Sequence, residues 1–154
     1  MPATHPKDAA SFHFLSIVAS ACALAAKAHE VVGPDHLLLS VSYQNGPLWR
    51  VTVSELRIDP IAVRLHVESS VDAHNQPDEV LTCGVLSSEA NAIIGDAHAL
   101  GEERGCTSPL NVGTLLLALL GNTEIAATLD ACGVDAATLK VHVERNLERL
   151  TDEL

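Results

Sequence analysis

The residues best suited to chemistry in this 154-residue chain are its eight histidines and four cysteines. Histidine nitrogens and cysteine thiolates are common zinc ligands, and a thiolate beside a histidine is a common nucleophile. The spacing favours neither use. The cysteines, at positions 22, 83, 106 and 132, form no CxxC pair. His29 and Glu30 do not begin the zinc motif HExxH, because Gly33 stands where the second histidine is required.

Two other histidines, His66 and His142, stand at corresponding places of two similar segments, each two residues before a glutamate. We interpret both as partly buried packing residues, with a metal ion held between them as the alternative. The cysteines are interpreted as small buried apolar residues rather than disulfides or metal ligands.

A catalytic role has little support in the sequence. The phosphate-binding pattern GxxxxGK[ST] is absent, because none of the three lysines follows a glycine, and no cysteine stands in a recognisable nucleophile motif. We therefore predict that the chain is not an enzyme and needs no cofactor and no metal ion. A small metal-dependent enzyme that uses the histidines is the less favoured alternative.

Charge and composition narrow the classes of partner. Twenty acidic residues outnumber nine basic ones, which gives a net charge of −11. A nucleic-acid partner needs a basic face, and so does an anionic membrane surface, so neither is expected. No apolar run reaches the length of a transmembrane helix. Aromatic residues make up only 3% of the chain, so the core must consist of aliphatic side chains, which favours closely packed helices. Cysteines that stay reduced are typical of a reducing compartment, so a cytoplasmic location is expected.

The sequence contains an internal repeat. Ile58–Glu68 matches Val134–Glu144 at an offset of 76 residues, and Leu37–Leu39 matches Leu115–Leu117 at an offset of 78. We place an N-terminal tail at 1–10, repeat one at 11–72, a polar linker at 72–85 and repeat two at 86–150. The two repeats are expected to form one unit, 11–150.

Each repeat is predicted to contain four helices, which gives an all-α fold. Repeat one has helices at 11–29, 34–44, 48–57 and 60–72, and repeat two at 88–103, 112–121, 123–132 and 136–151. The expected helix-start residues are Gly33, Pro34, Asp59, Pro60, Ser87, Asn122 and Asp135, and Gly133 is an expected helix stop. Residues 63–68 and 139–144 also alternate as strands do, but the preceding aspartates favour helices.

The repeat resembles the Clp N-terminal domain, the double-repeat module that begins Clp/Hsp100 unfoldases. In Ala25–Leu39, AAKAHEVVGPDHLLL, the helix end and the Gly-Pro-Asp-His-Leu run are similar to the family's Leu-Gly-His, then Val/Ile-Gly-Thr-Glu-His and a leucine-rich helix. Leu56–Asp59 and Ala131–Asp135 are similar to its Leu-x-x-x-Gly-Val/Ile-Asp. Ser87–Ala90 is similar to the opening of its second repeat. The resemblance implies two four-helix repeats related by a pseudo-twofold axis.

The resemblance also implies a binding site at the start of the second helix of each repeat. Asp35 and His36 stand where the family has Glu-His, and Gly113 and Thr114 take those places in repeat two. In some members the acidic residue helps to bind modified or basic side chains. Asp35 is therefore expected to contact a cationic group, whereas repeat two has lost the carboxylate. For His36 itself, a structural role at the helix start is favoured.

A groove between the repeats is the second expected binding surface, because the joint of a duplicated helical module is a natural concave site. Phe12 and Phe14, together with Tyr43 and Trp49, are candidates to line it. For each of these aromatic residues, simple packing is the alternative.

The function implied by the resemblance is non-enzymatic binding of Clp adaptors, substrate proteins or peptide ligands. Because the sequence has no ATPase motif, we expect a free-standing copy that competes with a full-length unfoldase for ligands or sequesters them. The alternative is an accessory subunit that docks on the Clp protease or its ATPase and regulates assembly.

Overall fold

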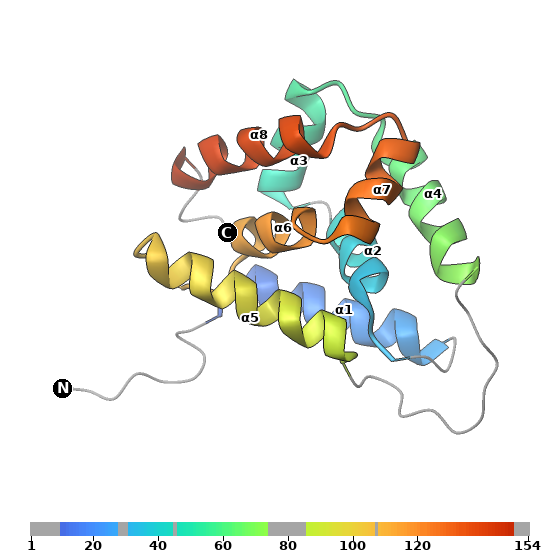
Figure 1. The fold of residues 1–154 in the computed structure, drawn as a ribbon, viewed down its shortest axis with the longest axis horizontal. Coiled ribbons are helices and arrows are strands. Elements are labelled where there is room, and N and C mark those ends of the chain that lie inside the picture. Colours follow the sequence, from blue (N-terminus) through green and yellow to red (C-terminus); the bar gives the residue numbers. More distant parts are fainter. Residues whose placement is uncertain (1–9, 28–30, 45, 74–85, 107, 150–154) are drawn as a thin grey trace.

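The computed structural model describes residues 10–27, 31–44, 46–73, 86–106 and 108–149. These residues form eight α-helices and no strand, so the prediction of an all-α fold is confirmed (Figure 1). The helices are α1 (Phe12–Lys27), α2 (Pro34–Gln44), α3 (Pro47–Glu55), α4 (Pro60–Ala73), α5 (Ser88–Glu103), α6 (Val112–Leu120), α7 (Thr123–Ala131) and α8 (Ala136–Arg149).

The helix boundaries lie within two residues of those expected, because the local start signals work as the sequence indicates. Ser87 accepts a hydrogen bond from the backbone N–H of Ala90, and Asn122 accepts from two N–H groups of α7. Asp59 and Asp135 cap α4 and α8 in the same way. The first two residues of the expected linker belong to α4, and its remainder, like residues 1–9, lies outside the described residues.

The central layer consists of α2 and α6, the second helix of each repeat. All nine residues of α6 and eight of the eleven residues of α2 are buried. Each central helix packs against the first and last helices of its own repeat and also contacts the first helix of the other. Both leucine triplets therefore lie in one hydrophobic core that the repeats share.

The third and fourth helices pack across the boundary between the repeats. Helix α3 packs on α8, and its counterpart α7 packs on α4, so the third helix of each repeat contacts the fourth helix of the other. Two isolated parallel β-bridges show the same reciprocity. Ala10, before α1, pairs with Leu110, before α6, while Leu86, before α5, pairs with Val32, before α2. Their backbone hydrogen bonds, Ser11 N–H to Leu110 O and Ser87 N–H to Val32 O, are both 2.8 Å long.

A search of the described residues for membrane-spanning helices finds no single helix that is long and apolar enough. Helices α6 and α7 pass the length and composition criteria only as a pair, and they are bent by 88° relative to each other.

Close packing makes Gly101 in α5 intolerant of a side chain. A Cβ atom there would lie 2.2 Å from the carbonyl oxygen of Pro109. Gly101→Ala is therefore expected to lower the free energy of unfolding by about 1–3 kcal/mol, measured by urea denaturation. Gly95→Ala in the same helix is the control: no atom lies within 4 Å of its Cβ position, so it should stabilise the protein by about 0.5–1 kcal/mol. Equal effects of the two variants would contradict this packing.

The turns after α3 and α7 allow a second comparison. Arg57 and Gly133 occupy equivalent positions and both have positive φ, 55° and 82°. The following N–H closes each turn, from Ile58 to Val53 O at 2.8 Å and from Val134 to Leu129 O at 2.9 Å.

A residue with a Cβ atom is strained in this left-handed conformation, whereas glycine is not. Arg57→Gly should raise the free energy of unfolding by about 0.5 kcal/mol, and Gly133→Ala should lower it by about 1 kcal/mol. Urea denaturation measures both. Destabilisation by Arg57→Gly would show that the arginine side chain makes a compensating contact.

Candidate functional site

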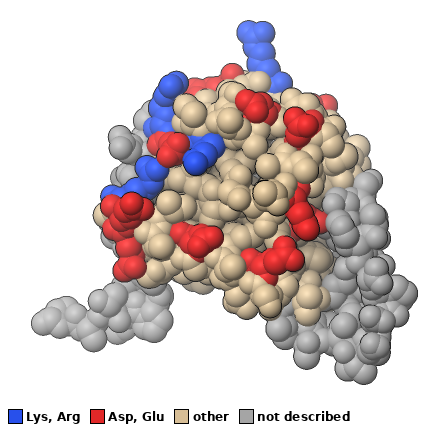
Figure 2. All heavy atoms as spheres, in the orientation of Figure 1, with Lys and Arg blue, Asp and Glu red and all other residues tan. Residues whose placement is uncertain are grey.

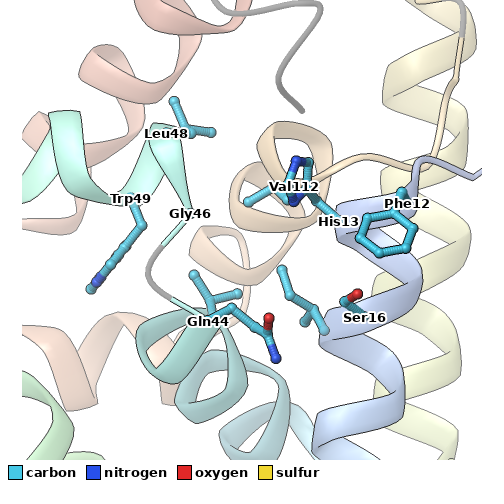
Figure 3. A pocket seen from close by; sticks show the side chains of 10 residues that line it. Phe12, His13, Ser16, Gln44, Gly46, Leu48, Trp49 and Val112 are labelled. Carbon is cyan, nitrogen blue, oxygen red and sulfur yellow. The ribbon is translucent and has the colours of Figure 1, made fainter.

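A pocket of about 220 Å³ lies where the N-terminal ends of α1, α3 and α6 meet the C-terminal end of α2 (Figure 3). It is therefore mainly a feature of repeat one, with one wall from repeat two. The lining residues are Phe12, His13, Ser16, Ile17, Val41, Gln44, Gly46, Leu48, Trp49 and Val112.

The inner wall of the pocket is apolar. Ile17, Val41, Leu48, Trp49 and Val112 are all buried and belong to the shared core, which holds them in place. The Ser40 hydroxyl on α2 donates a 2.7 Å hydrogen bond to the carbonyl of Ile17 and so joins α1 to α2 beside the pocket. The wall is thus a rigid surface against which an apolar group can pack.

Phe12 forms an exposed aromatic edge of the pocket. Its side chain is 78% exposed, the highest exposure among the large apolar residues that the structure describes. Its ring lies against the ring of His13 in an edge-on arrangement, with the centroids 5.9 Å apart. An exposed phenylalanine beside an apolar pocket is unfavourable in water, and a ligand that covers it would gain hydrophobic free energy.

The polar side chains in the lining are those of His13, Ser16 and Gln44. Among the residues that the structure describes, no Asp, Glu, Lys or Arg lines the pocket. In Figure 3, Gln44 extends from α2 toward α1, where Ser16 lies, and His13 stands between Phe12 and Val112. The arrangement favours a neutral, largely apolar ligand group rather than a charged one.

The aromatic residues expected to line a groove between the repeats divide into three situations. Phe12 and Trp49 line the pocket, and Val112 adds the contact from repeat two. Phe14 is 4% exposed and packs in the core, so it has no surface for a ligand in this structure. Tyr43 lies outside the lining. It donates a hydrogen bond to Glu68, which raises the pKa of the phenol.

The residues expected at the starts of the second helices do not meet at this pocket. Asp35 and Gln44 are at opposite ends of α2, about 13 Å apart along the helix axis. Asp35 is partly buried in the first turn, and His36 is only 5% exposed. Gly113 and Thr114 are buried at the start of α6.

His36 and Thr114 do the same structural work. The N–H of Gly33 donates to Nδ1 of His36 at 3.0 Å, and the N–H of Asn111 donates to Oγ1 of Thr114 at 3.1 Å. In both repeats the side chain at the third helical position satisfies the backbone before the helix, as in a capping box. A structural role for His36 at the helix start is thus confirmed. The sequence pattern did not reveal that Thr114 replaces it in this role.

Gly113, the counterpart of Asp35, has no space for a carboxylate. A Cβ atom there would lie 2.9 Å from Leu147 of α8. The side chain of Thr114 is fully buried and donates a 2.7 Å hydrogen bond to Pro109 O. Both residues thus serve the packing of α6 in this structure, and their contact with a ligand stays a prediction.

The histidines and cysteines are the residues with the potential to bind a metal ion or act as a nucleophile. His142 is nearly buried, with Nε2 2.7 Å from Oε1 of Glu55 on α3, which joins the two repeats. Among the described residues no group of three or more His, Cys, Asp and Glu side chains could hold a metal ion. Burial raises the pKa of the Cys132 thiol, which is opposite to the shift that activates a nucleophile. Cys83 lies outside the described residues.

No protein-family model and no curated protein sequence matches the chain. Solved structures do match it over most of its length. The Hsp104 N-terminal domain from Candida albicans has a TM-score of 0.75 at 19% identity, covering 87% of this chain and 88% of that one. The N-terminal domain of the chaperone ClpD from Arabidopsis thaliana has a TM-score of 0.73 at 14% identity, covering 96% and 99%.

The third similar structure is the N-terminal domain of the ClpV1 ATPase from the E. coli EAEC Sci1 type VI secretion system. Its TM-score is 0.72 at 21% identity, and the match covers 94% of this chain and 86% of that one. A chain at 22% identity and the same TM-score comes from a structure described as a peptide from the SciI protein of that system. The all-helical architecture, with eight helices in the described residues, matches these structures. The chain has the fold of the Clp/Hsp104 N-terminal domains.

Proposed function

We propose that the protein is a non-enzymatic module that binds peptide segments of other proteins in the Clp system, adaptors or substrates among them. The observation that carries this proposal is the pocket between α1, α2, α3 and α6, with Phe12 exposed at its edge. The shared fold supports it, because the similar structures include N-terminal domains of Clp ATPases and chaperones, one of them described with a peptide.

The size of the pocket indicates what part of a partner would enter it. Pockets that enclose a whole small molecule usually measure about 300–1,000 Å³, and this one measures about 220 Å³. It is therefore suited to a single apolar side chain, with the rest of the segment lying on the surface. Such a buried anchor typically contributes a large share of the binding free energy.

The charge distribution affects the approach of a partner. Figure 2 shows acidic side chains around a broad uncharged area of one face, with Lys and Arg gathered over the part occupied by α8. With a net charge of −11, the protein attracts basic segments at long range. In this proposal Asp35 contributes to that attraction, and the pocket provides the specific contact.

Docking on a protease or ATPase subunit is the second candidate. The observation in its favour is an exposed aliphatic pair on α4, Ile61 and Leu65, which are 62% and 60% exposed and one helical turn apart. These residues are suited to a flat protein interface rather than to a peptide anchor.

Selection of random heptapeptides displayed on phage tests the first candidate. We expect enriched sequences to share one large apolar residue, and the corresponding synthetic peptide to bind Phe12→Ala about tenfold or more weakly than the wild type. Leu15→Ala is the matched control, since Leu15 is an exposed apolar residue of the same helix outside the pocket. Fluorescence anisotropy of the labelled peptide measures both.

The same selection distinguishes the alternatives. Enriched Arg- or Lys-rich peptides whose binding is lost in Asp35→Asn, with Phe12→Ala unaffected, would move the site to the start of α2. If no peptide is enriched, co-purified Clp subunits that are lost with Leu65→Ser would favour docking through α4. Thermal melting of each variant checks that the fold is retained.

A further inference from the structure

The pocket contains more hydrogen-bonding capacity than an apolar anchor can use. The Ser16 hydroxyl and the Gln44 amide make no hydrogen bond to any other described residue, although both line the pocket. Water satisfies such groups while the pocket is open. A ligand that covers them must replace that water with its own donors and acceptors, because an unsatisfied buried polar group costs about 1–3 kcal/mol.

The side chain of Gln44, the last residue of α2, does not cap the helix that follows. In repeat two the N-cap of α7 is Asn122, and its side-chain oxygen accepts from the N–H groups of Glu124 and Ile125. In repeat one the counterpart of Asn122 is Gly46, the N-cap of α3, which provides no side-chain cap. The exposed amide of Gln44, two residues before Gly46, is therefore available to a ligand.

Three other residues that line the pocket also have counterparts of a different chemical type in repeat two. Phe12, Ser16 and Trp49 correspond to Ser88, Ala92 and Ile125. Repeat two thus lacks the exposed aromatic edge, the hydroxyl and the indole wall at these places. The binding chemistry of the pocket is confined to repeat one.

A carboxamide side chain matches one ligand group particularly well. It carries an N–H donor and a C=O acceptor side by side, and so does a peptide group of an extended chain. A helical ligand already uses its main-chain groups internally, whereas an extended segment leaves them free. The uncharged side chains of the described lining residues agree with a neutral peptide group rather than a carboxylate or a guanidinium.

We propose that the pocket recognises an extended peptide segment at a single site per chain, with one apolar side chain against Trp49 and the adjoining main-chain amide hydrogen-bonded to Gln44 and Ser16. This inference rests on the proposed peptide-binding function and specifies the conformation of its ligand. The peptide group supplies the hydrogen bonds and the side chain supplies the apolar contact.

Two small probes separate these contributions: N-acetyl-L-phenylalaninamide, which carries a side chain and peptide groups, and toluene, which carries the side chain alone. The indole N–H signal of Trp49, the one tryptophan of the chain, reports occupancy in ¹H–¹⁵N NMR titrations. We expect the wild type to bind the amide probe about fivefold more tightly than toluene. Gln44→Leu, which keeps a side chain of similar size at an exposed position, should abolish this preference and retain toluene binding.

The outcomes of these titrations distinguish main-chain recognition from the proposed function of the pocket as a peptide-binding site. Equal binding of both probes to the wild type, or a preference that persists in Gln44→Leu and in Ser16→Ala, would overturn the main-chain recognition and leave the apolar pocket in place. Shifts of the Trp49 signal by neither probe would overturn the pocket itself as a binding site. A stoichiometry of two amide probes per chain would contradict the confinement to repeat one.

Discussion

The reciprocal pairing of the two repeats is the constraint on which the rest of the structure depends. In each repeat, the segment before the first helix pairs with the segment before the second helix of the other repeat. One backbone hydrogen bond of 2.8 Å joins each pair of segments. The third helix of each repeat then packs on the fourth helix of its partner. Neither repeat can bury its own helices completely, so the shared core forms only when both are folded. The pocket inherits its rigidity from this arrangement, since its walls are core residues.

The two repeats differ in residue type, backbone conformation and burial at several equivalent positions. Asp35 is partly buried in the first turn of α2, whereas Leu147 fills the space beside its counterpart Gly113. Arg57 adopts a conformation that suits the glycine of repeat two. Helix α6 is buried along its whole length, while α2 ends at the pocket with exposed polar residues. Both repeats thus contribute to the shared core, while nine of the ten pocket-lining residues belong to repeat one.

Most of the fold could be predicted from the sequence, because its signals are local and occur twice. Helix starts are marked by capping residues whose short-range hydrogen bonds need no tertiary contacts. These residues are Asp59, Ser87, Asn122 and Asp135. The pocket could be predicted only in part. Phe12 and Trp49 were noticeable as rare aromatic residues, but the convergence of Ser16, Gln44 and Val112 depends on how three helix ends meet. Burial of Phe14 and Thr114 likewise depends on tertiary packing, which residue type and spacing do not determine.

The single contact that Val112 makes with the pocket ties ligand binding to the integrity of the whole chain. Val112 begins the helix whose start is fixed by Asn111 and Thr114, so a ligand seated against it touches both halves of the duplication. Any molecule that binds only the folded form shifts the folding equilibrium in proportion to its concentration and affinity. A ligand bound in the proposed pocket would therefore stabilise all eight described helices together.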